Sequence, residues 1–135
     1  MTNLELARWT AALLGVFLVL FGLAGFVDNP LVGLPAADPV FAAGTLQNVI
    51  HVGSGALILF AAFGMAGAGI VRALFVLAAG FGALFLLTVI SPSLFGLFDP
   101  PANLACHVLH GGVAVLSATV AWLARGRPVG ALTTV

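Results

Sequence analysis

Two apolar segments of the sequence carry histidines together with other hydrogen-bonding side chains. The polar residues are Gln47, Asn48, His51 and Ser54 in the first segment, and Asn103, His107 and His110 in the second. Histidine exchanges protons near neutral pH and is the commonest metal ligand. An ionisable residue inside a membrane-like apolar run is a functional candidate by default. These residues therefore define the chemistry that the chain offers.

The spacing of these residues predicts two polar stripes on helices, because residues three or four apart share a helical face. The first stripe comprises Gly44, Gln47, Asn48, His51, Ser54 and Gly55, and the second comprises Asn103, His107, His110, Gly111, Ala114 and Ser117. An unsatisfied polar group in hydrocarbon is costly. We therefore expect both stripes to face inward, toward each other or toward a shared cavity.

The depth of each histidine within its helix selects the expected pair. At about 1.5 Å per residue, His51 lies roughly 18 Å from Pro39, whereas His107 and His110 lie roughly 10 Å and 15 Å from Pro100. If the two prolines begin their helices at the same level, His51 is closest in height to His110. His107 is the alternative partner.

Three kinds of chemistry fit these residues. The leading interpretation is a core in which neutral histidines hydrogen-bond across helices. Two facing imidazoles also suit axial ligation of a haem b iron, and His51, His107 and His110 together suit a transition metal. A proton or small-ligand pathway is the third. No carboxylate lies on either stripe, and Cys106 points about 100° away from His107 on a helix.

The composition places these stripes in a membrane protein. Of the 135 residues, 62% are hydrophobic and only 6% are charged, and the mean hydropathy is +1.26. Soluble domains carry about 25% charged residues, so this chain cannot assemble a water-facing surface. Four arginines and no lysine exclude a basic surface for nucleic acid. We expect the lipid bilayer as the main partner, with a homo-oligomer or a larger membrane complex as further candidates.

Four segments are long enough to cross a bilayer, which takes about 20 apolar residues. They span residues 8–27, 40–66, 70–90 and 103–124. The fold class that follows is all-α: an integral membrane four-helix bundle with up-down-up-down topology, formed by a single domain over residues 1–135. Asp38-Pro39 and Asp99-Pro100 resemble helix starts, and the glycine-rich GAG at 67–69 resembles a tight turn. The first segment is too long for a typical signal peptide, so we expect it to be retained.

The arginines predict the orientation. Arg8, Arg72, Arg125 and Arg127 fall on one side of the predicted bundle, and Asp28, Asp38 and Asp99 fall on the other. Arginine-rich ends face the cytoplasm. Trp9 and Trp122 lie at the same ends, as expected of an aromatic belt. We therefore predict a multi-pass protein of the cell inner (plasma) membrane with both termini cytoplasmic.

The segments GVFLVLFGLAGFV (15–27) and GTLQNVIHVGSGALILFA (44–61) resemble the family of small bacterial membrane proteins catalogued as domain of unknown function 4383. That family has four spans, an N-x-x-H-x-x-x-G signature in the second span, and a similar motif opening the fourth. Asn48, His51 and Gly55 match the first signature. In the fourth span His107 and Gly111 keep the H-x-x-x-G half, but Asn103 lies four residues before the histidine instead of three. The resemblance implies fold and membrane location, and it transfers no activity.

The leading functional prediction is a small, non-enzymatic membrane protein with a structural or accessory role. Ser54 and Ser117 lack a G-x-S-x-G context, and no carboxylate is placed to orient a histidine near either of them. The first alternative is a membrane redox component that binds haem or a metal. The second is a proton or small-ligand pathway or a transporter accessory subunit.

Overall fold

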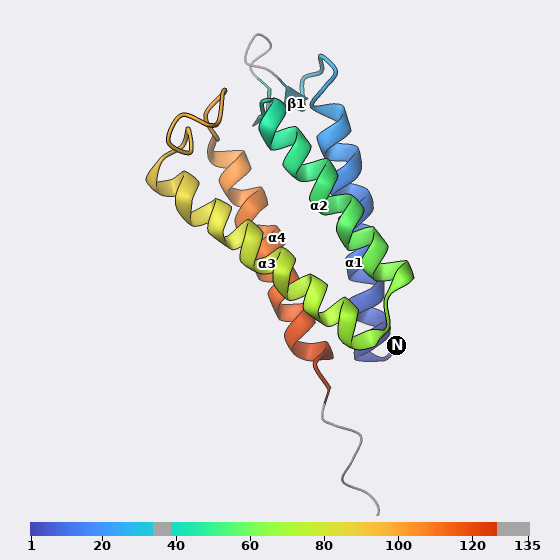
Figure 1. Cartoon of the computed structure of the whole chain (residues 1–135). Coiled ribbons are helices and arrows are strands. Elements are labelled where there is room, and N and C mark those ends of the chain that lie inside the picture. The colour runs from blue at the N-terminus through green and yellow to red at the C-terminus, as the bar shows by residue number, and fades with distance from the viewer. Residues whose placement is uncertain (34–38, 127–135) are drawn as a thin grey trace, which may run out of the picture.

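The structure, a computed structural model, describes residues 1–33 and 39–126. Within these ranges four helices are long and apolar enough to cross a membrane, and they pack as a bundle (Figure 1). The helices are α1 (Asn3–Ala24), α2 (Thr45–Gly64), α3 (Gly67–Ile90) and α4 (Leu104–Ala124). The all-α bundle predicted from the sequence is thus confirmed, and the protein is a multi-pass membrane protein.

Two short strands lie in the loop between α1 and α2. β1 (Val32–Gly33) and β2 (Phe41–Ala42) pair in parallel, with Val32 opposite Phe41 and Gly33 opposite Ala42. The sequence gives no sign of this pairing, because each strand has only two residues. Its consequence is that the chain approaches α2 in an extended conformation.

The prediction that Asp-Pro pairs begin α2 and α4 is wrong. Asp38 lies outside the described residues, and α2 begins only at Thr45, after the extended residues of β2. The N-cap of α4 is Asn103, whose side-chain oxygen accepts a hydrogen bond of 3.1 Å from the backbone N–H of Cys106. An amide oxygen in this position satisfies a donor that the first turn leaves free, and it fixes the helix start three residues after Pro100.

The other helix boundaries also differ from the predicted spans. α1 begins at Asn3 because Thr2 and Glu5 form a capping box: the Thr2 hydroxyl accepts from the Glu5 N–H, and the Glu5 carboxylate accepts from the Thr2 N–H. The predicted turn at 67–69 is instead the first turn of α3, and the connection from α2 consists of Met65 and Ala66.

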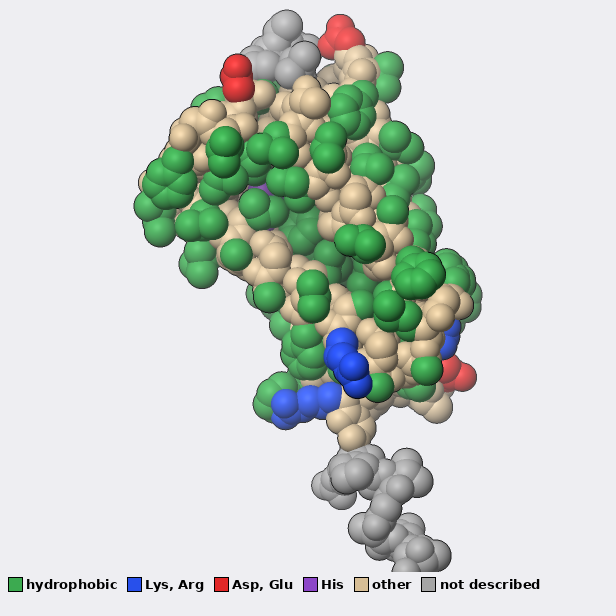
Figure 2. All heavy atoms as spheres, viewed as in Figure 1, with side chains coloured by type: hydrophobic (Ala, Val, Ile, Leu, Met, Phe, Trp, Pro, Cys, Tyr) green, Lys and Arg blue, Asp and Glu red, His purple; other side chains and the backbone are tan. Residues whose placement is uncertain are grey.

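The described arginines and aspartates lie at opposite ends of the bundle (Figure 2), and Glu5, in the first turn of α1, lies at the same end as the arginines. The loops that follow α1 and α3 lie at one end, called here the loop end, and they carry Asp28 and Asp99. The other, the arginine end, carries Arg8, Arg72 and Arg125. Arg127 lies outside the described residues. The expected separation of arginine from aspartate therefore holds for the described charges, and which end faces the cytoplasm stays a prediction.

The bundle consists of two hairpins. α1 packs most extensively against α2, and α3 against α4. A Cβ atom added at Gly22 would lie 2.7 Å from the carbonyl oxygen of Asn48, and one added at Gly55 would lie 2.7 Å from the backbone nitrogen of Val19. Small residues at such positions let two helix backbones approach closely, which is the usual basis of helix packing in a bilayer.

The half of the bundle near the arginine end has an apolar core. Its fully buried side chains include Ala7 and Ala11 on α1, Ala62 on α2, and Leu74 on α3. Polar bonds close the ends of the helices: Arg8 donates to the carbonyls of Ala62 and Met65 at the end of α2. Cations suit a helix C-terminus because the last carbonyls are free and the macrodipole is negative there.

Candidate functional site

His51 on α2 and His110 on α4 lie side by side inside the bundle. Each lies six residues after the first residue of its helix (45 to 51, and 104 to 110), and α2 and α4 run in the same direction (Figure 1). Their ring centroids are 5.9 Å apart with an angle of 42° between the planes. Both side chains are only 2% exposed. One histidine from each hairpin therefore takes part in the contact between the hairpins, which also includes α1 against α4.

Two phenylalanines complete a cluster to which each helix contributes one ring. Phe21 of α1 meets His51 edge to face, with centroids 5.0 Å apart. Phe81 of α3 stacks on His51 at 6.0 Å and meets His110 in a T-shaped arrangement at 5.7 Å. We call these four residues the histidine–phenylalanine cluster. Its rings exclude lipid from the imidazoles and hold both histidines in place.

Hydrogen-bond partners are missing for several polar atoms of this region. Among the described residues, none bonds to the Nδ1 atoms of His51 and His110, to the Oδ1 atom of Asn48, or to the hydroxyl of Ser117. A buried polar atom without a partner costs about 1–3 kcal/mol. In native proteins such atoms bond to protein groups or ordered water. The cluster thus has hydrogen-bonding capacity that a small molecule would use.

His107 lies apart from this pair and faces α3. Its Nδ1 atom is 3.2 Å from the hydroxyl oxygen of Thr88, which also donates to the carbonyl of Leu84 at 2.7 Å. A hydroxyl has a single hydrogen. Because Thr88 donates this hydrogen to the carbonyl of Leu84, the imidazole of His107 is the donor to the hydroxyl oxygen of Thr88. His107 therefore joins α4 to α3 within one hairpin, whereas His51 and His110 join the two hairpins.

The other four predicted site residues, Gln47, Ser54, Asn48 and Asn103, bond to backbone groups. Gln47 accepts a 2.5 Å hydrogen bond from the N–H of Gly44, and so closes the first turn of α2. Ser54 is half-buried and donates to the carbonyl of His51 on its own helix. These two side chains contact neither His107 nor His110 through hydrogen bonds.

The two asparagines of the predicted stripes hold neighbouring elements together. Asn48 donates to the carbonyl of Gly25, at the end of α1, over 2.8 Å. Asn103 caps α4 and also donates to the carbonyl of Val40 over 2.9 Å. Cys106, which is buried, donates to the carbonyl of Ala42 over 3.2 Å. At the loop end, these contacts tie α2 to the end of α1, and they tie the segment before α2 to α4.

A metal site would draw on His51, His107 and His110, the candidates from the sequence. No group of three or more His, Cys, Asp or Glu side chains within residues 1–33 and 39–126 is arranged to hold a metal ion. His51 and His110 are the two that face each other, and His107 is engaged by Thr88. Any metal or haem chemistry of the described chain would therefore rest on two imidazoles.

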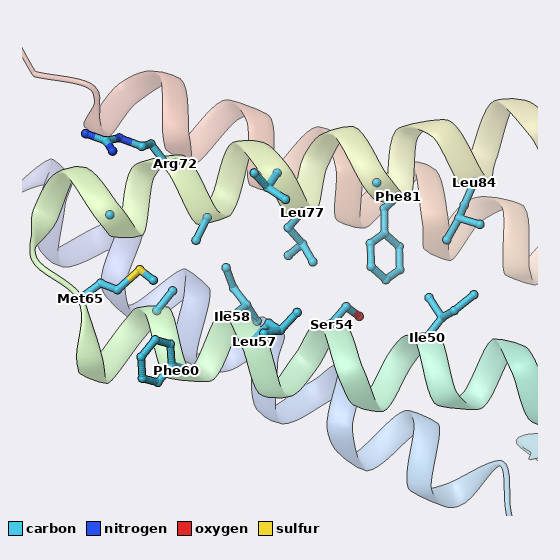
Figure 3. Close-up of a pocket in the computed structure, with 15 residues that line it drawn as sticks. Ile50, Ser54, Leu57, Ile58, Phe60, Met65, Arg72, Leu77, Phe81 and Leu84 are labelled. Carbon is cyan, nitrogen blue, oxygen red and sulfur yellow. The ribbon is translucent and has the colours of Figure 1, made fainter.

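A lipid-facing pocket of about 740 Å³ lies on the side of Phe81 away from the two histidines (Figure 3). It runs between α2 and α3, and Phe81 projects into it from α3 near Ser54 of α2. The same phenylalanine ring contacts both histidines. One side chain therefore forms a wall shared by the pocket and the histidine–phenylalanine cluster.

Sequence reasoning missed Thr88 and the two phenylalanines. Thr88 had a signal, because it and Arg72 are the only residues of α3 whose side chains carry hydrogen-bonding groups. Phe21 and Phe81 had none, since the chain contains 11 phenylalanines and apolar segments reveal no inward face to distinguish them.

Comparisons with protein-family models, with curated proteins and with solved structures give no match. The resemblance to domain of unknown function 4383 stays a prediction. Of the residues that carry it, Asn48 and Gly55 pack against α1, and His51 belongs to the cluster. Gly111 on α4 faces Phe85 of α3.

Proposed function

We propose that this membrane protein is non-enzymatic, with a structural or accessory role, and that its histidine–phenylalanine cluster holds a small uncharged hydrogen-bonding molecule between the two hairpins. Water is the simplest molecule of this class. The proposed location is the plasma membrane with the arginine end in the cytoplasm, as the positive-inside rule favours. Membership of the domain of unknown function 4383 family belongs to the same proposal.

One observation carries this proposal: His51 and His110 come from different hairpins, lie 5.9 Å apart by ring centroid, and both have an Nδ1 atom without a partner among the described residues. A neutral imidazole offers one donor and one acceptor. A molecule between two such rings can bond to both, and each bond would join α2 to α4.

The apolar half of the bundle argues against the alternative of a proton pathway. Between the cluster and the arginine end, the buried described side chains are almost all alanine, leucine, isoleucine and valine. Ser117 is the last buried polar residue on α4. A proton path needs a continuous series of donors and acceptors or water, and this half of the described chain offers no support for one.

A haem- or metal-binding redox role is the second candidate, and the facing imidazoles are the observation that favours it. Bis-imidazole ligation places iron between two rings. Here the ring of Phe81 lies 6.0 Å from His51 and 5.7 Å from His110. A porphyrin between the two imidazoles would therefore require Phe81 to leave the cluster. A small molecule would not require this movement.

Nitrogen-15 NMR of histidine-labelled protein in lipid tests the proposal. We expect the Nδ1 resonances of both His51 and His110 to show hydrogen bonding. His51→Phe should abolish the His51 resonance and shift the His110 resonance. His107 serves as an internal control, because Thr88 already bonds to it. Nδ1 resonances typical of free imidazole in both rings would refute the proposal.

Visible absorption and metal analysis of the same sample separate the two candidates. We expect colourless protein with no stoichiometric metal. A Soret band that is present in the wild type and lost in His51→Phe would establish the redox candidate instead.

A further inference from the structure

The pocket between α2 and α3 extends from the arginine end toward the middle of the bundle. Met65 and Arg72 line one end of it, and Ile50 and Leu84 line the other (Figure 3). Although the connection of α2 to α3 is very short, these helices make much less contact than α1 makes with α2 or α3 makes with α4. The space between them opens to the side, toward the surrounding lipid.

The lining of the pocket is apolar except at two positions. Ser54 is one, and its hydroxyl is bonded to its own helix. Arg72 is the other, and it is the only charged residue that lines the pocket. Hydrocarbon therefore suits most of the length of the pocket, and an anion suits one end.

Arg72 differs from the other described arginines. Arg8 donates to the carbonyls that end α2, and Arg125 lies over the ring of Trp122. No residue of the described chain forms a hydrogen bond or ion pair with Arg72, which is exposed. A free guanidinium presents five donors in a planar fork that matches a phosphate.

We propose that the pocket between α2 and α3 binds an anionic phospholipid, with its phosphate on Arg72 and an acyl chain along the helices toward Phe81. Along α3 the distance from residue 72 to residue 84 is about 18 Å, and one leaflet of hydrocarbon is about 15 Å deep. The pocket thus has the length of a single acyl chain, with the charge placed where a headgroup would lie. Basic positions between transmembrane helices are known to receive anionic headgroups.

The order of charge and apolar surface in the pocket favours a lipid over a helix from another protein or from a second copy. Arg72 is the only charged residue of the lining and lies at one end, and the rest of the lining is apolar except for Ser54. An anionic headgroup followed by a hydrocarbon chain has the same order of charge and apolar surface.

Native mass spectrometry of the full chain, released from detergent after incubation with defined lipids, tests the inference. The probes are phosphatidylglycerol and phosphatidylcholine with identical acyl chains. We expect retention of phosphatidylglycerol about fivefold above phosphatidylcholine, the effect expected of one arginine near a headgroup. Arg72→Gln should remove this preference, whereas Arg125→Gln, which changes an arginine at the same end but outside the pocket, should keep it.

A second pair of variants tests the acyl chain. Gly80 lines the pocket, and a Cβ atom at this position would meet open space. Gly80→Leu should lower retention of both lipids at least threefold by filling the pocket. Gly112→Leu, an equally open glycine on α4, should leave retention unchanged. Circular dichroism of each variant verifies that the helices are intact.

Four results would overturn the inference. Equal retention of the two lipids by the wild type would remove the role of charge. An equal loss in Arg72→Gln and Arg125→Gln would indicate a diffuse attraction to the arginine end. A dimer that Gly80→Leu dissociates would identify a second copy as the occupant. We also expect that inorganic phosphate at millimolar concentration does not displace the lipid; displacement would mean that the site binds the phosphate group alone.

Discussion

The two neighbours of α2 pack against it in opposite ways. α1 is connected to α2 by a long loop with its own pair of strands, and yet these helices are in intimate contact through Gly22 and Gly55. α3 follows α2 after two residues, and the two helices leave a pocket of about 740 Å³ between them. Proximity along the chain therefore does not determine how closely two helices of this bundle pack, because the pair with the shorter connection makes the looser contact.

The largest effect is expected from closing the contact that Gly55 permits. We predict that Gly55→Ala destabilises the protein by about 3 kcal/mol, because its Cβ would meet the backbone of α1. Gly53→Ala, two residues away with nothing near its Cβ, should not destabilise the protein, because alanine has the higher helix propensity. Unfolding by sodium dodecyl sulfate, followed by circular dichroism, measures both. Equal effects of the two substitutions would contradict the close approach of α1 and α2.

A smaller effect is expected from the hydrogen bond between the same two helices. Asn48→Leu preserves side-chain volume but leaves the carbonyl of Gly25 without its donor. We predict a loss of about 2 kcal/mol, the cost of an unsatisfied buried carbonyl. Val49→Ala, which changes a neighbouring side chain that is 53% exposed, provides the control in the same denaturation assay. Unchanged stability in Asn48→Leu would mean that this bond contributes nothing net.

The smallest effect is expected on the other side of α2. Leu57 lines the pocket and is 72% exposed. We predict that Leu57→Ala costs less than about 0.5 kcal/mol. Ile58→Ala, at the next position, removes a side chain that is 2% exposed and should cost about 2 kcal/mol or more. Comparable losses of stability in the two variants would show that α2 and α3 pack closely in the membrane, and would contradict the presence of the pocket.

The membrane spans could be predicted because they follow from composition and from the placement of charge. Helix starts could not, because they depend on local competition for backbone donors. Asp99 and Pro100 suit a helix start on their own, but Asn103 caps the first turn of α4. Before α2, pairing with β1 keeps residues 41 and 42 extended, and no two-residue strand leaves a pattern in sequence.

The site was predictable to the extent that periodicity determines which face of a helix carries polar groups. The spacing placed His51 and His110 on inward faces at similar depth, and the structure brings their rings together. The spacing could not distinguish side chains that face another helix from side chains that bond to nearby backbone groups. Gln47 lies on the same stripe as His51, but the hydrogen bond that it accepts from Gly44 depends on where α2 begins.

The burial of Cys106 makes the protein convenient for chemical mapping. Its thiol, the only one in the sequence, is 3% exposed and bonded to the carbonyl of Ala42. Maleimide reagents added to the folded protein should therefore leave the wild type unlabelled. A membrane-impermeant reagent labels only cysteines that face the outside of the cell. Labelling of cysteines introduced singly at Thr2 and at Asp28 would then show which end of the bundle faces outward. A buried thiol that serves packing thus provides a clean background for determining topology in intact cells.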